Sequence, residues 1–256
     1  MKTYIIGEAA GTWLHGGLDA AKRSIHLAAS CGASAWKTQW TSDHLAMHKR
    51  RGIAGDHYKR LQWDINYHKE LSEACQKEGI DYLCTVFLPQ DIPIIAPYVA
   101  KFKVSAFEAY DDELLEAYGD HAKRLIVSLN PEGRDKFERP DKTQVLHCVS
   151  KYPTQLEEIR VNLIGVPIVL KSSAGMSVSK FYQGLSDHTT SVLTGAVAVG
   201  AGATILEKHV MTHDTPHDDP DYGHSLILDT ENKEFSFRQY VQNVRDAERM
   251  MYGSSL

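Results

Sequence analysis

Short apolar runs alternate with longer amphipathic segments along the whole chain. An apolar run of strand length predicts a buried parallel strand, and apolar positions three and four residues apart predict a covering helix. Eight runs are of the first kind: Tyr4 to Glu8, Ala33 to Gln39, Tyr82 to Phe87, Lys101 to Ala106, Arg124 to Leu129, Val145 to Ser150, Phe181 to Ser186 and Ala203 to Lys208. Seven segments are of the second kind: Leu18 to Ser30, Asp64 to Lys77, Asp91 to Tyr98, Asp111 to Tyr118, Thr154 to Leu163, Ser191 to Val199 and Asn232 to Met251. The pattern predicts the α/β class.

Eight strands with interleaved helices favour one closed (β/α)8 TIM barrel over an open doubly wound sheet. The 256 residues are close to the size of a complete barrel, and no linker or change in composition divides them, so we expect a single domain over residues 1–256. Pro167 to Met176 is expected to form an extra irregular or strand-like stretch before the seventh strand. The polar segment from Glu132 to Lys142 shows no clear helical pattern.

Composition excludes several classes of protein. Asp and Glu number 33 against 28 Lys and Arg, and no long basic run is present, so we expect no nucleic-acid partner. No export signal and no run of eighteen apolar residues occur, which predicts a cytoplasmic protein without a membrane partner. Cys31, Cys75, Cys84 and Cys148 form no CxxC pair and lie in apolar segments, which predicts buried reduced thiols rather than disulfides or a zinc finger.

Polar side chains gather where the predicted strands end, which is the face of a β/α barrel that carries the chemistry. The loop from Trp40 to Trp63 is rich in charge, His and Gly and is a candidate lid over this face. Polar residues at the strand ends are Glu8, Lys37, Gln39, Thr85, Lys103, Glu108, Ser128, Asn130, His147, Ser150, Lys151, Tyr152, Ser186, Asp187, His188, Glu207, Lys208 and His209.

Two lysines of this set, Lys37 and Lys103, fall within predicted strands, where a lysine needs an anionic partner. They either pair with Glu8 or Glu108 or bind a phosphate or carboxylate, and we prefer the anion-binding interpretation.

Histidines close the last two predicted strands. Neighbouring strands lie about 4.8 Å apart, so His188 and His209 could share one divalent ion and leave open coordination positions. Either histidine could instead hydrogen-bond a loop. In the acidic loop that follows, Asp221 is the carboxylate best placed to join the metal shell or to bind substrate hydroxyls, the alternative being a solvated loop.

Several motifs of the chain resemble those of one enzyme family. GLSDHTTS from Gly184 and GAVAVGAGATILEKHV from Gly195 resemble the signature of the sialic acid synthase family, which condenses phosphoenolpyruvate with an aldose. IGEAAG, AWKTQ, LCTVF, FKVSAFE, LHCVSKYPT and PDYGHSL occur in the family's order and extend the resemblance over nearly the whole chain.

The resemblance implies roles for particular residues. It implies a β/α barrel in which His188 and His209 hold a divalent ion, usually manganese or magnesium. The phosphoenolpyruvate contacts would be Lys37, Thr85, Lys103, Ser128 and Ser186. Glu108, Tyr152 and Asp221 match positions near the acceptor sugar or metal-bound water, and Glu108 or Glu8 would assist proton transfers. We therefore expect catalytic roles for Glu108, Glu8, Lys103 and Asp221, and a homo-oligomer, either dimer or tetramer.

The sequence departs from the family pattern at several positions. Ala106 replaces a serine, Ser150 stands in the substrate site where an asparagine is common, and SLNP from Ser128 replaces a Ser-Thr-Gly-Met run. The chain stops at Leu256, so we expect no C-terminal antifreeze-like domain with its arginine for the acceptor. The acceptor would then differ from N-acetylmannosamine, or another chain or the Trp40 to Trp63 loop would complete the site, or activity would be lost.

Two other functions remain open. One is a non-catalytic or partner-dependent barrel that binds ligand without turnover. The other is a metal-dependent aldolase or hydrolase that needs no phosphoenolpyruvate.

Overall fold

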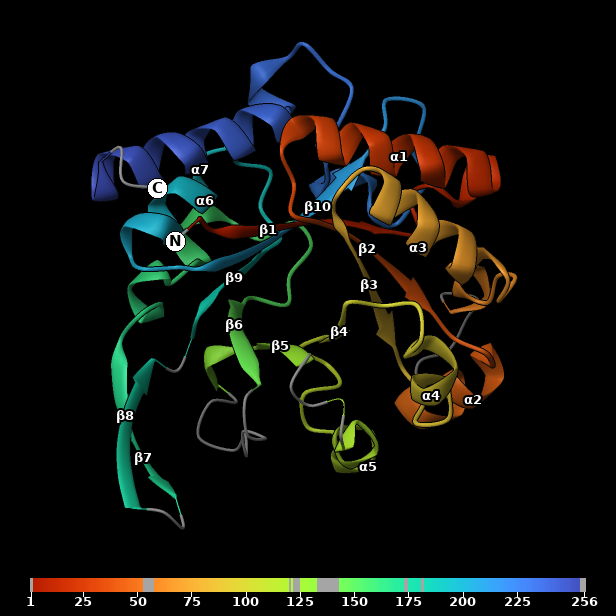
Figure 1. Cartoon of the computed structure of the whole chain (residues 1–256), viewed down its shortest axis with the longest axis horizontal. Helices are drawn as coiled ribbons and strands as arrows, with labels where there is room; N and C mark the ends of the chain where they lie inside the picture. The colour runs from red at the N-terminus through yellow and green to blue at the C-terminus, as the bar shows by residue number, and fades with distance from the viewer. Residues whose placement is uncertain are drawn as a thin grey trace.

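The computed structural model describes residues 2–52, 58–119, 121, 125–132, 143–172, 175–180 and 182–253, with the backbone alone over 167–172 and 175–180. Within these ranges eight parallel strands close into a barrel through the β1–β10 pair, and β11 lies beside β10. The fold is thus the single (β/α)8 TIM barrel that the sequence predicts (Figure 1). The strands are β1 (Tyr4–Ala10), β2 (Ala35–Trp40), β3 (Asp81–Val86), β4 (Lys101–Val104), β5 (Leu125–Leu129), β6 (Gln144–Cys148), β9 (Gly184–Asp187), β10 (Ile205–Met211) and β11 (Leu226–Ile227).

All eight predicted barrel strands are present, with ends that differ by at most three residues. Two predicted starts, Arg124 and Phe181, lie outside the described residues. Apolar side chains fill the space between the barrel and the helices because strands of a parallel sheet are buried on both faces.

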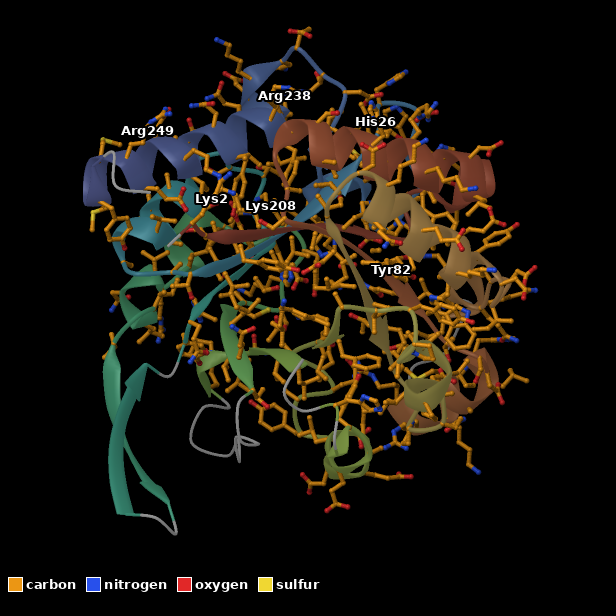
Figure 2. The ribbon with its side chains drawn as sticks, viewed as in Figure 1. Lys2, His26, Tyr82, Lys208, Arg238 and Arg249 are labelled. Carbon is orange, nitrogen blue, oxygen red and sulfur yellow. The ribbon has the colours of Figure 1, made fainter. Side chains whose placement is uncertain are left out.

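Helices cover the outside of the barrel. α1 packs against α3, and α6 packs against α7, whose buried residues recur every three or four positions. In Figure 2, Arg238 and Arg249 lie along the outer side of α7, whereas Lys208 and Tyr82 lie inside the molecule. The described helices are α1 (Gly17–Cys31), α2 (His44–Arg51), α3 (Tyr67–Lys77), α4 (Asp91–Ile95), α5 (Asp112–Ala117), α6 (Thr194–Gly200) and α7 (Phe237–Tyr252).

One predicted helix, Thr154 to Leu163, is wrong. Two 3₁₀ turns, Leu156–Glu158 and Val161–Leu163, replace it, and Ile159 between them has extended backbone. Ile159, Val161 and Leu163 pack on the core. Their spacing of two residues fits an extended chain rather than a helix.

The segment that follows forms a projecting antiparallel hairpin. β7 (Pro167–Ser172) pairs with β8 (Gly175–Lys180), and Figure 1 shows the pair extending away from the barrel. The expected extra strand-like stretch is therefore present. Of the polar segment from Glu132 to Lys142, all but Glu132 lies outside the described residues.

The loop after β2 contains a helix that the sequence pattern did not predict. Asp43 caps α2 by accepting hydrogen bonds from the backbone of Leu45 and Ala46, but Met47 is the one buried residue of that helix. Because one residue of the helix is buried, the segment does not show apolar residues repeated every three or four positions, which is the pattern that predicts a helix. No helix in the described ranges is both long and apolar enough to cross a membrane. The four cysteines are buried and unpaired.

Candidate active site

The interior of the barrel changes from apolar to polar over two residues. Six apolar side chains form one interior layer: Ile6, Ala35, Leu83, Ile126, Leu146 and Ile205. Because side chains of a strand alternate between its faces, the residues two positions further on also point inward. They are Glu8, Lys37, Thr85, Ser128, Cys148 and Glu207.

A cavity of about 420 Å³ lies at the carboxyl end of the strands. It brings together most of the residues that the sequence nominates, although they come from segments far apart in the chain. Those that line it are Lys37, Thr85, Lys103, Glu108, Ser128, Tyr152, Ser186, His188, His209 and Asp221.

Two lysines and two glutamates form a buried charge cluster in the cavity wall. Lys37 forms an ion pair with Glu8, and its Nζ lies 3.7 Å from Glu207 Oε1. Lys103 Nζ lies 3.3 Å from Glu207 Oε2. The cluster therefore balances its own charge while both lysines still face the cavity, so ion pairing and an anion site are both compatible with the structure.

Hydroxyl groups extend this cluster. Lys37 Nζ donates to Thr85 Oγ1 at 3.1 Å, and Lys103 Nζ donates to Ser128 Oγ at 2.7 Å. Ser186 lies in the same wall. Ammonium and hydroxyl donors on one wall are the groups that a phosphate or carboxylate accepts from.

Burial and the paired charges set the protonation of this cluster. Burial raises the pKa of Glu8 to about 7, against the lowering effect of Lys37. Burial also acts on Glu207, but Lys103 and Lys37 outweigh it and lower its pKa. Burial acts to lower the pKa of Lys37, but Glu8 and Glu207 raise it overall. Burial thus dominates at Glu8, whereas the two lysines dominate at Glu207.

Three histidines also line the cavity, close to one another. The ring centroids of His188 and His209 lie 5.4 Å apart, and those of His209 and His224 lie 4.5 Å apart. His188 Nδ1 lies 2.8 Å from the carbonyl oxygen of Val149, which fits an N–H donor and leaves Nε2 free. Burial lowers the pKa of His188 to about 4 and that of His209 far below its usual value, so both rings are neutral.

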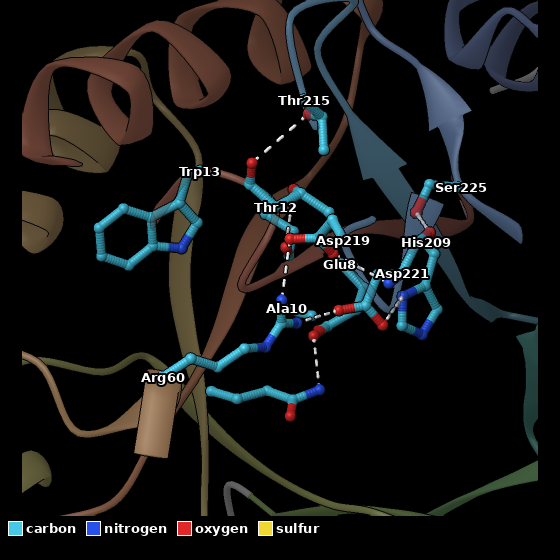
Figure 3. A network of polar contacts seen from close by, with 12 residues as sticks. Glu8, Ala10, Thr12, Trp13, Arg60, His209, Thr215, Asp219, Asp221 and Ser225 are labelled. Atoms are coloured by element: carbon cyan, nitrogen blue, oxygen red, sulfur yellow. Dashed lines mark hydrogen bonds and ion pairs between the residues drawn. The ribbon is translucent and has the colours of Figure 1, made fainter. Parts of the chain in front are cut away.

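Asp221 lies between two of these histidines. Figure 3 shows Arg60 reaching Asp221 and Asp219, and Asp221 beside His209. Arg60 Nη2 donates to Asp221 Oδ2 at 2.6 Å, while Oδ1 lies 3.6 Å from His209 Nδ1 and 3.4 Å from His224 Nε2. The carboxylate is therefore held in the cavity wall and is not part of a solvated loop.

Glu108 pairs with an arginine of the loop after β2. It forms an ion pair with Arg51 and accepts from the hydroxyl of Ser105. The expected alternative of a lysine partner is therefore wrong for Glu108, because Arg51 is its ion-pair partner. Burial raises the pKa of Glu108 despite Arg51. Ser105 supplies a hydroxyl next to Ala106, the position at which the sequence suggested a lost one.

The predicted lid contributes directly to the cavity. Arg51, Tyr58, Arg60 and Leu61 of this segment line it. A neighbouring arginine, Arg50, binds Asp111 and Glu113 of the loop and helix after β4, which anchors α2 across the mouth of the barrel.

Two predicted site residues do not line the cavity. Glu8 is fully buried behind Lys37 and is also bound by Gln39 Nε2 at 3.1 Å. Ser150 donates from its hydroxyl to Asn130 Oδ1 at 3.2 Å. Glu8 can thus act on a ligand through Lys37, and the Ser150 hydroxyl is engaged by Asn130.

Sequence reasoning gave no role to four charged or imidazole residues of the cavity wall: Glu207, which it listed at a strand end, and His224, Arg51 and Arg60. Glu207 precedes His209 by two residues on one strand, so the period of two could have placed both inside the barrel. Arg51 is the last residue of α2, whereas Arg60 and His224 lie in short 3₁₀ turns. No periodicity in these segments indicates which side chains turn inward.

The donor set fits a divalent metal ion. His209, Asp221 and His224 place ligand atoms within 4.8 Å of one another, and His188 adds a neutral imidazole beside them. His209 Nδ1 and His224 Nε2 are buried and have no hydrogen-bond partner. Buried imidazole nitrogens that lie close together and have no hydrogen-bond partner are suited to bind one cation between them.

A β/α barrel with cationic and imidazole groups at its carboxyl end has the layout of an enzyme site. The model of the NeuB family matches residues 17–255, and the chain belongs to that family. Its members include the sialic-type sugar-acid synthases, and this chain is an enzyme of that kind, as the sequence resemblance predicts.

Individual relatives support this placement. An uncharacterised protein of Methanocaldococcus jannaschii is 30% identical over 97% of this chain and 72% of its own length. Pseudaminic acid synthase of Campylobacter jejuni is 29% identical over 96% of this chain and 74% of its own length. The crystal structure of the N-acetylneuraminic acid synthetase of Leptospira borgpetersenii covers 100% of this chain and 87% of its own, with a TM-score of 0.81 and 24% identity. This last likeness shows the shared fold.

Proposed function

We propose that the protein condenses phosphoenolpyruvate with an aldose, with the help of a divalent metal ion, to give a 2-keto-3-deoxy sugar acid and phosphate. One observation carries the proposal: a wall of lysines and hydroxyls and a cluster of histidines line the same cavity. The first suits an anionic substrate, and the second suits a Lewis-acidic ion that activates a carbonyl group.

The lysine wall would bind phosphoenolpyruvate. Lys37 and Lys103 would contact its phosphate and carboxylate, and the hydroxyls of Thr85, Ser128 and Ser186 would donate to the remaining oxygens. The ion pairs with Glu8 and Glu207 hold both lysines in place before the substrate arrives. This preorganisation reduces the rearrangement needed on binding.

The histidines would hold the metal ion. His188 and His209 are the ligands that the sequence nominates, and the resemblance suggests manganese or magnesium. When bound, the ion would polarise the aldehyde oxygen of the open-chain sugar. Asp221 and Tyr152 line the same part of the cavity and would bind the sugar beside it.

In the reaction, C3 of phosphoenolpyruvate bonds to the aldehyde carbon, and the aldehyde oxygen takes up a proton. Water then adds to C2 and loses one proton. The C2–O bond to phosphate breaks as the new hydroxyl gives its remaining proton to the leaving phosphate, which leaves the ketone. Glu108, in the cavity wall with a raised pKa, is placed to carry these protons. Glu8 is placed behind Lys37 to exchange a proton with that lysine.

The test is release of inorganic phosphate from phosphoenolpyruvate in the presence of manganese and a panel of aldoses, with N-acetylmannosamine among them. We expect phosphate and a 2-keto acid in equal amounts, and neither when phosphoenolpyruvate is omitted. Product formation without phosphoenolpyruvate would indicate an aldolase or hydrolase instead.

Two variants link this activity to the site. His188→Ala and His209→Ala should abolish metal-dependent turnover, while His213→Ala, at an exposed histidine bound to Asp229, should leave it unchanged. Absence of turnover with every aldose, or full activity in both site variants, would overturn the proposal.

A further inference from the structure

We infer that His224 is a third imidazole ligand of the metal ion, so that the site prefers nitrogen-binding ions such as Zn²⁺ and Co²⁺ over Mn²⁺ and Mg²⁺. The inference rests on the proposed function in one respect, namely that this cavity holds a divalent ion. It goes beyond the two histidines that the sequence nominates.

The position of His224 supports this role. It lies in a 3₁₀ turn, Tyr222–His224, which follows β10, and only 2% of its surface is exposed. Its ring centroid lies 4.5 Å from that of His209 and 6.4 Å from that of His188. His209 on β10, His188 directly after β9 and His224 in a loop thus have their ring centroids within 6.4 Å of one another.

Two polar atoms at this centre lack a hydrogen-bond partner of normal length. His224 Nε2 and His209 Nδ1 are both buried and without a hydrogen-bond partner. Their distances to Asp221 Oδ1, 3.4 and 3.6 Å, exceed those of a normal hydrogen bond to nitrogen. A buried nitrogen left without a partner costs free energy, and a shared metal ion would remove that cost at both atoms.

The neighbours of the centre hold its ligands in place. Arg60 binds Asp221 Oδ2 at 2.6 Å, which directs Oδ1 towards His209 and His224. Tyr152 packs on His188 at 4.2 Å and on His224 at 4.9 Å between ring centroids. Such outer contacts orient metal ligands and commonly carry much of the affinity.

The types of ligand atom at the site determine which metal ion it prefers. Imidazole nitrogen suits zinc, cobalt, iron and copper, whereas magnesium prefers oxygen ligands and retains water. Three imidazoles and one carboxylate are thus a nitrogen-rich set. A site with two histidines and several waters would discriminate less between these ions.

X-ray absorption at the zinc and cobalt edges tests the inference without any measurement of activity. The full-length protein is stripped with a chelator and loaded with one equivalent of Zn²⁺ or Co²⁺. The imidazole count is expected to be three in the unaltered protein and two in His224→Gln. Two imidazoles in the unaltered protein would overturn the role of His224, whether or not the variant folds.

Competition titrations with Zn²⁺, Co²⁺ and Mn²⁺ provide the second readout. His224→Gln should weaken Zn²⁺ binding by at least about tenfold and should reduce the preference for Zn²⁺ over Mn²⁺. His217→Gln, in the same loop, should leave both unchanged. Equal Zn²⁺ affinity in His224→Gln and the unaltered protein would overturn the inference alone, whereas no binding of any ion by the unaltered protein would also remove the metal from the proposed function.

Discussion

Glu207 is the carboxylate that the two buried lysines share, with only 4% of its surface exposed. Glu207→Gln would leave Lys103 without this counter-charge and weaken the restraint on Lys37. Loss of one partner of a buried ion pair costs about 3–5 kcal/mol, and we expect a loss of that order in urea unfolding. The matched control is Glu73→Gln, at an exposed carboxylate 4.0 Å from Lys69, which should change stability by less than about 1 kcal/mol.

We also expect Glu207→Gln to respond more strongly to added phosphoenolpyruvate. Because Lys103 would lack its counter-charge, added phosphoenolpyruvate should raise the melting temperature of Glu207→Gln more than that of the unaltered protein. An unaltered stability together with an equal ligand effect would show that the pairs with Glu207 do not organise the lysines.

Lys37 tests the anion-binding wall directly. Its ammonium is buried and faces the cavity, so Lys37→Met removes a charged donor without shortening the side chain. A hydrogen bond to a charged group contributes about 1.5–3 kcal/mol, so phosphoenolpyruvate should bind about 10- to 100-fold more weakly in calorimetry. Lys22→Met, at an exposed lysine on α1, is the control and should bind phosphoenolpyruvate normally. Equal affinity in all three proteins would exclude Lys37 from the substrate site.

At the scale of the element, α6 and α7 meet at a glycine. A methyl group at Gly195 would lie 2.5 Å from the Tyr240 ring and 2.8 Å from Val244, both on α7. Gly195→Ala should therefore destabilise the protein by about 1–3 kcal/mol in urea unfolding. Gly200→Ala at the end of the same helix meets nothing within 4 Å and should be neutral or slightly stabilising. Equal stability of the two variants would contradict this packing.

The strands were easier to predict than the segments between them. Each barrel strand is buried on both faces, so a short apolar run marks it directly. The helix predicted from Thr154 is wrong because the same apolar residues also fit the two-residue spacing of an extended chain. The sequence did not predict α2 because Met47 is the one buried residue of that helix. The spacing of apolar residues in a segment therefore predicts its helix or strand only where those residues are the ones that pack on the core.

At the scale of the whole molecule, buried neutral histidines make stability depend on pH. Burial lowers the pKa of His68 to about 3 and that of His147 to about 4. Below about pH 6.5 the unfolded chain takes up protons that the folded protein does not, so this stability is present above pH 6.5 and is lost as the pH falls towards those values.

Urea unfolding of the metal-free protein between pH 7 and pH 5 measures this loss. Each such histidine should contribute a decrease of about 1.4 kcal/mol per pH unit below its unfolded pKa. His68→Gln should flatten the curve by one such contribution, and His26→Gln, at a histidine with 62% of its side chain exposed, should leave the slope unchanged. Parallel curves for His68→Gln and the unaltered protein would contradict this origin.

The assembly of the site shows where sequence reasoning ends at this scale. Residues on barrel strands converge because closure brings every carboxyl end to one mouth, which allowed Lys37, Lys103, His188 and His209 to be nominated together. His224 and Arg60 enter from loops, and their direction depends on contacts with Tyr152, Asp219 and Asp221. Such contacts exist only after the chain has folded, so no local pattern reports them.

The segment after β2 is fastened across the cavity by arginine side chains that bind carboxylates of distant loops. The pairs of Arg50 with Asp111 and Glu113 are partly exposed, so dissolved ions screen them. Potassium chloride should therefore loosen the segment and speed cleavage by trypsin after Arg50 and Arg60, while the barrel strands stay resistant. A bound substrate would oppose this effect, so the ionic strength of the medium would set how readily the cavity exchanges its contents.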